Sequence, residues 1–315
     1  MTNLKKLGLT ALAGSLVATS AFAGEMSVSG TAKVSYTSGD TLAVTGNPWS
    51  ASNALSFSGG GELDNGMNVT LSFILDEADP TPGPFDSHSL AISMDGLGTL
   101  KFHGEGGGSA VGDMDGSAAG GIWDNFQAAA DEPKSGKSSD DMLTYAAPTL
   151  YEGLALNASY TPGGIGFGGK ASSTSWSATY TGVEGLTVAY GTGEDNSAAV
   201  EATATAWKVA YAYGPITVTA TDLEYDHGTD TSDRDMESQA ISYTISDELS
   251  VTYGVEEITD GSASSEKAEF ESISASYVSG GMTLTVSSQE AKNHSYSTTA
   301  TEDNERWAIS AAFAF

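Results

Sequence analysis

The side chains of this chain that could do chemistry are mainly carboxylates, because its 315 residues include 41 acidic residues, four histidines and no cysteine. The four histidines form no pair at metal-ligand spacing and no recognisable Ser/His/Asp pattern. The stretch Ser135-Gly136-Lys137-Ser138 contains the Gly-Lys-Ser end of a phosphate-binding loop, but Asp131 stands where that motif requires glycine. The sequence therefore predicts no enzyme.

Two groups of aspartates offer the oxygen ligands that calcium prefers. One is Asp113-x-Asp115-Gly116, and the other is an acidic run made of Asp226, Asp230, Asp233 and Asp235. Neither group completes an EF-hand loop, and solvated surface charge is the simpler interpretation. Calcium bound by Asp113, Asp115, Asp226 and Asp230 is kept as an alternative, and no other cofactor is expected.

Charge and hydropathy exclude several classes of protein. A formal net charge of -29 argues against a partner nucleic acid, because affinity for phosphate backbones comes from Lys and Arg. The mean hydropathy of -0.16 and the lack of a long apolar run beyond the N-terminus argue against membrane-spanning helices. With 5 Trp, 13 Tyr and 10 Phe the chain has too many aromatic residues for a disordered protein. A folded chain rich in β-prone and small residues remains.

The first 23 residues resemble a cleaved export signal. Lys5 and Lys6 precede an apolar stretch from Leu7 to Ala18, and Ala21-Phe22-Ala23 provides a small-x-small cleavage site. We therefore expect residues 1–23 to be a signal peptide and residues 24–315 to be one mature domain. Losing two lysines would take the formal charge from -29 to about -31. An exported chain without cysteine must be held together without disulfides.

The dominant pattern of the mature chain is alternation with period two, which indicates strands with two chemically different faces. From Met26 to Tyr36, for example, every second residue is apolar or glycine, and polar residues lie between them. About 16 such segments follow one another, each roughly 9 to 11 residues long, which is the length that a tilted strand needs to cross a bilayer.

The connections between these segments alternate between short turns and long polar loops. Asp64-Asn65-Gly66, Asp95-Gly96 and Gly214-Pro215 are hairpin turns in which Gly, Asn and Asp tolerate positive φ angles. An array of strands with one trimmed and one elaborated end is typical of an outer-membrane barrel. The sequence therefore predicts an all-β protein, a transmembrane antiparallel β-barrel with short periplasmic turns and long external loops.

The chemistry of the two strand faces supports this arrangement. The polar face is mostly Ser, Thr and Gly, and the acidic residues gather in the loops, whereas a water-soluble sandwich would carry Lys and Glu on its outer face. A barrel turns its apolar face to lipid and its small polar face to a wet lumen. Aromatic residues near segment ends, such as Tyr36, Tyr213 and Trp307, fit the girdles at the membrane interfaces.

The whole mature chain resembles the general bacterial porins, of the kind found in alphaproteobacteria. The resemblance rests on the export signal, the alternating segments, Leu143 to Pro148 followed by Tyr151-Glu152-Gly153-Leu154, and the last segment from Trp307 to Phe315. It implies a homotrimer of 16-stranded barrels in the outer membrane of a Gram-negative bacterium. It also implies contacts with lipid and lipopolysaccharide, one water-filled pore per subunit, a third external loop folded into that pore, and Phe315 as a signal to the outer-membrane assembly machinery.

The third long loop runs from Gly106 to Asp141 and contains seven acidic residues and two lysines, for a net charge of about -5. If the loop folds inward, its carboxylates line the narrowest part of the pore; the alternative is a solvated external loop. The carboxylates expected at the constriction are Asp113, Asp115, Asp124, Asp131 and Glu132.

The opposite side of such a constriction would be basic. Alternation places five basic residues on the polar face of their strands: Lys33, Lys101, His103, Lys208 and Arg306. Pointing such a charge to lipid at the bilayer midplane would cost about 2–4 kcal/mol. The chain departs from the porin pattern in having only two arginines, Arg234 and Arg306, in place of a cluster. Because carboxylate rings favour cations, we expect a channel for passive diffusion of small hydrophilic solutes that prefers cations.

A second class of function stays open at this point. The chain could be a secreted acidic β-rich surface protein, structural or calcium-binding, without a pore. A substrate-specific channel with a binding site in the lumen is also compatible with the sequence.

Overall fold

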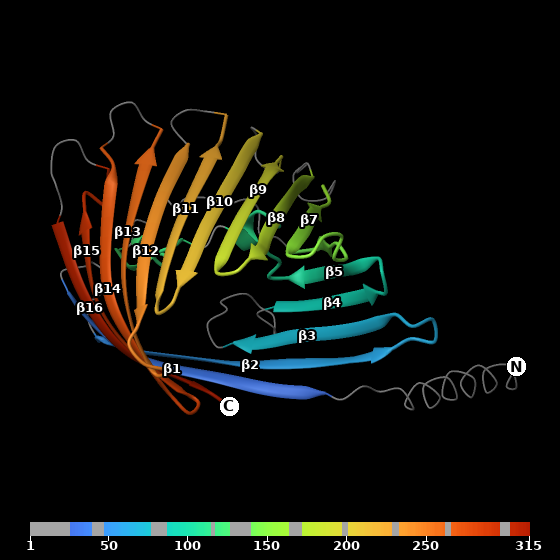
Figure 1. The fold of residues 1–315 in the computed structure, drawn as a ribbon, viewed down its shortest axis with the longest axis horizontal. Helices are drawn as coiled ribbons and strands as arrows, with labels where there is room; N and C mark the ends of the chain where they lie inside the picture. The colour runs from blue at the N-terminus through green and yellow to red at the C-terminus, as the bar shows by residue number, and fades with distance from the viewer. Residues whose placement is uncertain are drawn as a thin grey trace, which may run out of the picture.

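The computed structural model describes residues 26–39, 47–76, 87–114, 117–126, 140–163, 172–196, 201–228, 233–261, 266–296 and 303–315. The proposed signal peptide, residues 1–23, lies outside these ranges, as do Asp115, Asp131, Glu132 and Asp230. Within the described part the chain forms 16 antiparallel strands in one closed barrel, so the predicted fold class is confirmed (Figure 1). The described residues contain no helix long and apolar enough to cross a membrane.

The strands follow one another around the barrel in chain order. The first eight are β1 (Ser27–Gly39), β2 (Trp49–Glu62), β3 (Asn68–Asp76), β4 (Ser87–Met94), β5 (Gly98–Glu105), β6 (Met142–Ala146), β7 (Leu154–Thr161) and β8 (Ser173–Val183). The second eight are β9 (Leu186–Asp195), β10 (Ala202–Tyr213), β11 (Ile216–Asp226), β12 (Arg234–Thr244), β13 (Leu249–Asp260), β14 (Ala268–Ser279), β15 (Met282–Lys292) and β16 (Asp303–Ala314). The wall is shortest at β6, which has 5 residues, whereas β8 to β16 have 10 to 12.

The barrel closes where the last strand meets the first. β16 pairs with β1 from Thr31 opposite Ala314 to Gly39 opposite Arg306. The C-terminal residue extends this ladder, because Phe315 and Gly30 exchange two backbone hydrogen bonds of 2.7 and 3.0 Å. Because the barrel closes, neither β1 nor β16 has an unpaired edge. A membrane-spanning sheet needs this closure, since lipid offers no hydrogen-bond partners to exposed backbone groups.

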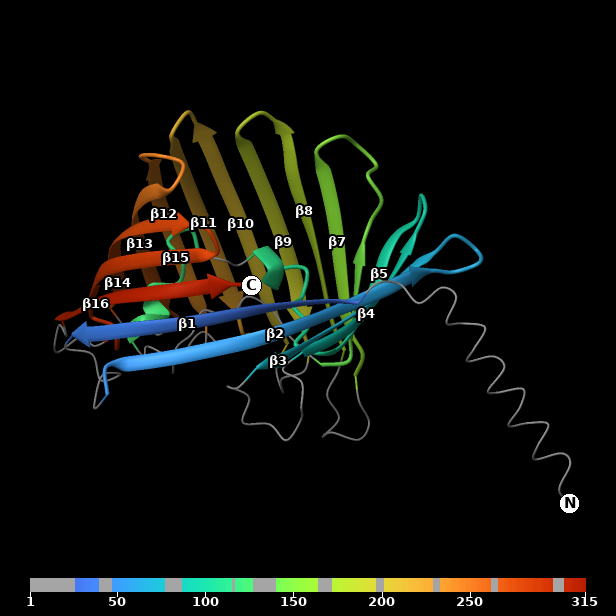
Figure 2. The same cartoon turned by 90° about the horizontal axis from the view of Figure 1, so that it is seen from below.

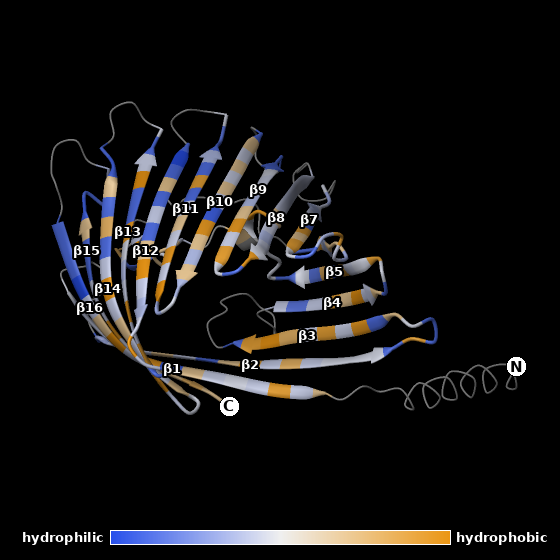
Figure 3. Ribbon diagram, in the orientation of Figure 1, coloured by the Kyte–Doolittle hydropathy of each residue, from blue (hydrophilic) through white to orange (hydrophobic). Residues whose placement is uncertain are grey.

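Alternation along the strands separates an outward from an inward face. On β12, for example, Ile241 and Tyr243 are exposed to the outside, whereas Met236, Ser238 and Ala240 are buried on the inner side. Coloured by hydropathy, the strands show alternating apolar and polar bands (Figure 3). The exposed apolar residues form the outer surface that a bilayer would cover.

The short turns are those expected from the sequence. The turn between β8 and β9 contains Gly185 at φ 75°, and a β-carbon there would lie 2.4 Å from the carbonyl oxygen of Ala212 on β10. Glycine is therefore required both for the backbone conformation and for the close approach of the next strand.

Candidate functional site

The third loop leaves β5 at Glu105 and returns at Met142, and its described parts fold back into the barrel. It contains two short 3-10 helices, η3 (Gly112–Met114) and η4 (Trp123–Phe126). Figure 2 shows both inside the curved wall. The expected inward fold is therefore confirmed for these parts of the loop.

The first part of the loop is fixed to β7 and β8 by serine side chains. The amide of Ala110 donates to the Ser159 hydroxyl at 3.1 Å, and the amide of Val111 donates to the Ser175 hydroxyl at 3.4 Å. The two hydroxyls also bond to each other at 2.6 Å. Small hydroxyl side chains on the inner face let the loop backbone come close to the wall and satisfy its polar groups.

The second part, residues 117–126, lies against β11, β12 and β13. The amide of Ala118 donates to Thr221 at 3.0 Å and that of Ala119 to Ser238 at 3.0 Å. The carboxylate of Glu256 accepts the amides of Gly121 at 2.9 Å and Trp123 at 3.0 Å. This loop segment is therefore held by the wall at several successive residues.

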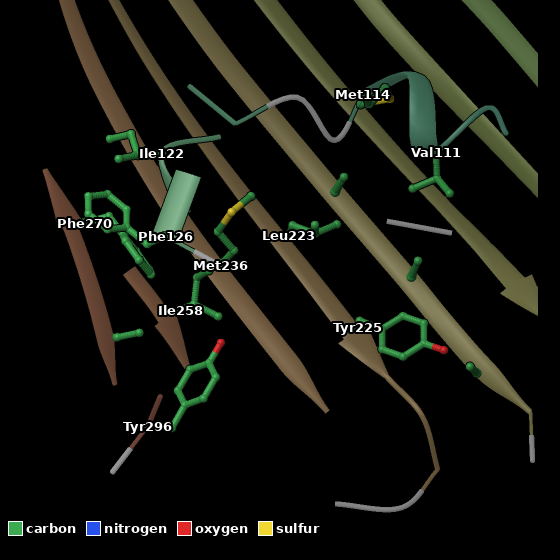
Figure 4. Packing of buried hydrophobic residues seen from close by; sticks show 14 of the residues in the cluster. Val111, Met114, Ile122, Phe126, Leu223, Tyr225, Met236, Ile258, Phe270 and Tyr296 are labelled. Carbon is green, nitrogen blue, oxygen red and sulfur yellow. The ribbon is translucent and has the colours of Figure 1, made fainter. Parts of the chain in front are cut away.

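Beneath the loop the inner wall also carries large apolar residues, which differs from the small polar face expected from the sequence. In Figure 4, Ile122 and Phe126 of the loop lie beside Phe270, Met236 and Ile258 of the wall. The rings of Phe126 and Phe270 are 6.0 Å apart between centroids. The strand residues of this cluster, from β9 to β15, are Ala189, Ala202, Ala204, Ala206, Leu223, Tyr225, Met236, Ile258, Ala268, Phe270 and Ala291. Where the loop covers the inner face, apolar residues that pack against the loop thus lie among the polar side chains that bond to its backbone.

The predicted basic residues all lie on the inward side of their strands. Lys101 and His103 lie on either side of Phe102, which is exposed outward on β5. His103 is buried and lies 3.1 Å from the Thr144 hydroxyl, so it faces the lumen less openly than the sequence suggests. Lys33 is opposite Ala312 on β16, and Lys208 is opposite Thr221 on β11.

Arg306 is a predicted basic residue that interacts with the third loop through charge. Its guanidinium donates to the Gln289 side chain at 2.8 Å and interacts electrostatically with Asp124 of η4. Arg234, the second arginine, instead pairs with Asp260 at 3.0 Å. Of the predicted constriction carboxylates, Asp124 is the one whose side chain is described; Asp113 belongs to η3, but its side chain is not among the described ones.

Many acidic residues are placed differently from the expectation that they gather in the loops and at the constriction. At the external ends of β11 to β16, acids share the outward face with lipid-facing residues, as Glu237 does with Ile241. We call this set the outer acidic belt: Asp222, Glu237, Glu257, Glu269, Glu271, Glu290 and Glu305. Near a membrane interface a charge costs little, so these ends extend beyond the hydrocarbon layer.

Within the outer acidic belt, acids stand directly opposite other acids. Glu237 is paired with both Asp222 and Glu257, and Glu257 with Glu269. Lys267 bridges the last two, with its ammonium 2.6 Å from Glu257 and 3.1 Å from Glu269. These hydrogen bonds raise the pKa of Lys267 above its ordinary value. The belt is outside the lumen, so its charge does not line the pore.

The described carboxylates of the proposed calcium groups serve as hydrogen-bond acceptors in their own loop. Asp226 accepts the amide of Gly228 at 2.8 Å, and Asp233 accepts the amide of His227 at 2.9 Å. Among the residues that the structure describes, no group of three or more His, Cys, Asp or Glu is arranged to hold a metal ion. The calcium alternative stays a prediction, since Asp115 and Asp230 lie outside those residues.

Glu256 is the residue of the site that the sequence reading missed. Alternation does place it on the inner face of β13, between the outward-facing Val255 and Glu257, so the sequence contains that signal. Its partner in the loop could not be inferred, because Gly121 is 135 positions away.

The barrel is similar to several solved porins. The anion-selective porin from Comamonas acidovorans has a TM-score of 0.69 and 12% identity over 93% of this chain and 100% of that one. OmpF of Salmonella typhi, solved with daunomycin, has a TM-score of 0.69 and 12% identity over 93% and 98%. OmpT of Vibrio cholerae, in its trimer form, has a TM-score of 0.67 and 14% identity over 93% and 100%. At such identities the likeness shows the fold.

In sequence, no curated protein matches the chain. The family model described as Gram-negative porin matches residues 8–315, which is nearly the whole chain. This match, together with the fold, points to a channel and not to an enzyme, and gives no support to a secreted protein without a pore. The chain belongs to the Gram-negative porin family, whose members form channels in the outer membrane.

Proposed function

We propose that this porin mediates passive diffusion of small hydrophilic solutes and ions, and that it prefers cations. The observation that carries the proposal is the inward third loop, which presents Asp124 within electrostatic range of Arg306. A narrow place lined by opposite charges orients dipolar solutes and selects ions by the sign of the excess charge.

Cation preference follows from the charges of the loop. The segment 106–141 has seven acidic residues against two lysines. Lys33, Lys101, Lys208 and Arg306 on the inner wall act in the opposite direction. We expect the loop to dominate because its described parts lie inside the barrel, and because Asp113, Asp115, Asp131 and Glu132 would add to Asp124.

Reversal potentials across a planar bilayer, measured in a gradient of potassium chloride, test the preference. A permeability ratio in favour of potassium supports the proposal, and a ratio in favour of chloride would refute it. Swelling of liposomes in neutral sugars of increasing size tests passive diffusion separately, because it does not depend on charge.

We further propose that the protein is a homotrimer whose outer surface contacts lipid and lipopolysaccharide. OmpT of Vibrio cholerae, a structural neighbour, is a trimer. Residues 1–23 would be removed on export, and Phe315 would direct the chain to the outer-membrane assembly machinery. The mass of the detergent-solubilised protein before and after heating tests the trimer, and sequencing of the mature N-terminus tests cleavage before Gly24.

A further inference from the structure

Glu256 on β13 is a buried carboxylate whose hydrogen-bond donors come from the third loop. Only 2% of the residue is exposed. It accepts the amides of Gly121 and Trp123, one on each oxygen, and the hydroxyl of Ser117 on the first. A single wall residue therefore contacts the loop segment at three positions.

This arrangement makes the carboxylate and the loop depend on each other. A buried carboxylate is costly unless hydrogen bonds satisfy it, and hydrogen bonds to an ionised acceptor are stronger than neutral ones. If the loop moved away, Glu256 would lose its donors; if Glu256 were lost, the amides would lose their acceptor. Because each loss would leave buried polar groups without partners, the loop position in which these hydrogen bonds form is favoured over others.

The bonds are also placed to control the constriction. The amide of Trp123 is next to Asp124 in the chain, so Glu256 fixes the backbone from which the Asp124 carboxylate projects. On the same face of β13, Gly254 lets Ala119 lie against the wall, since a β-carbon at residue 254 would be 2.5 Å from that of Ala119. β13 thus provides both the carboxylate that binds the loop and the space in which the loop lies against the wall.

We propose that Glu256 is the positioning residue of the constriction, which fixes segment 117–126 on the wall and thereby sets the aperture and the place of Asp124. The inference rests on the proposed channel function. Because Glu256 is shielded from solvent, it acts through the position of the loop and not as a charge that passing ions meet.

Two substitutions separate position from charge. Glu256→Gln replaces one of the two acceptor oxygens with an amide donor, and Glu256→Asp keeps the carboxyl group but shortens its reach. Both should replace one steady single-channel current with several levels and raise the open-channel noise several-fold. Glu257→Gln, one residue along and on the outer face, is the matched control and should match the parent channel. Unaltered currents in both Glu256 variants would overturn the proposal.

A disulfide provides the rescue experiment. The hydroxyls of Ser117 and Ser238 are 3.0 Å apart, and the chain has no cysteine of its own. The pair Ser117→Cys and Ser238→Cys in the Glu256→Gln background should restore the steady current when oxidised and lose it on reduction. Noise that persists in the oxidised protein would show that Glu256 does not act by holding the loop.

Labelling tests the attachment without relying on transport. Ile122 is 1% exposed, so Ile122→Cys should react slowly with a water-soluble maleimide. Adding Glu256→Gln should speed labelling several-fold, while heat-dependent electrophoretic mobility verifies that the barrel is folded. An unchanged rate would overturn the attachment. If the parent protein passes no current, the proposed function fails, and the labelling rate still decides whether Glu256 holds the loop.

Discussion

Gly254 on β13 and Ala119 on the third loop lie so close together that a β-carbon at residue 254 would come within 2.5 Å of the Ala119 β-carbon. The backbone of β13 and the third loop are in contact at this point because glycine has no side chain. The same occurs at Gly191 on β9, where a β-carbon would lie 2.9 Å from the Met114 sulfur. The distance between the loop and the wall is thus set by residues that appear unremarkable in the sequence.

Gly254→Val is expected to push segment 117–126 into the lumen and to lower single-channel conductance a few-fold. The wall cannot yield, since β13 is paired on both sides. Gly59→Ala on the outward face of β2 is the control, because a β-carbon there meets only ordinary contacts of 3.8 Å. Conductance of the Gly254 variant equal to that of the parent would mean that the loop does not bound the open pore.

Asp124 and Arg306 are expected to shift ion selectivity in opposite directions. Asp124→Asn removes a loop carboxylate and should move the reversal potential towards chloride, whereas Arg306→Gln removes the facing cation and should move it towards potassium. Lys267→Gln is the control: Lys267 is exposed and pairs with Glu257 and Glu269 of the outer acidic belt, so this variant should leave the reversal potential unchanged. Equal shifts of the same sign in the two lumen variants would contradict an electrostatic role for this pair.

The fold could be predicted because lipid leaves few alternatives. A strand facing lipid on one side and water on the other must alternate, and hairpin turns at one end need residues such as Gly185 and Gly214. Both signals are local in sequence, so they can be read without knowing which strands pair. The basic residues Lys33 and Lys208 were placed inward by the same count.

The docking of the third loop could not be predicted in the same way. It depends on contacts between residues more than 100 positions apart, such as Gly121 with Glu256 or Ala118 with Thr221. Apolar residues on the inner face, such as Phe270, contradict simple alternation until the loop that covers them is known. The sequence could not place the acids of the outer acidic belt for a related reason: composition does not show how far a strand extends beyond the membrane.

Glu237→Gln is expected to stabilise the barrel. Glu237 is opposite Asp222 and Glu257 and repels Asp235 as well, and each unfavourable pair costs about 0.2–1 kcal/mol. Salt screens such repulsion, so the gain should be largest at low ionic strength and fade as sodium chloride is added. Denaturant titration of the protein in detergent micelles at two salt concentrations measures it. A gain independent of salt would argue against repulsion as its cause.

Gly185→Ala is expected to destabilise the hairpin between β8 and β9 more than the same substitution at Gly214, in the short turn between β10 and β11. At φ 75° a β-carbon alone costs about 1–2 kcal/mol, and here it would also collide with the Ala212 carbonyl oxygen at 2.4 Å. That collision would disturb the hydrogen bond of 2.8 Å from the Ala212 amide to the Gly185 carbonyl, which joins the turn to β10. Gly214→Ala is the control: its φ of 57° carries the conformational cost, but nothing lies within 4 Å of the added carbon. The temperature at which electrophoretic mobility changes should fall further for the Gly185 variant, and equal losses in the two variants would show that conformation alone requires glycine there.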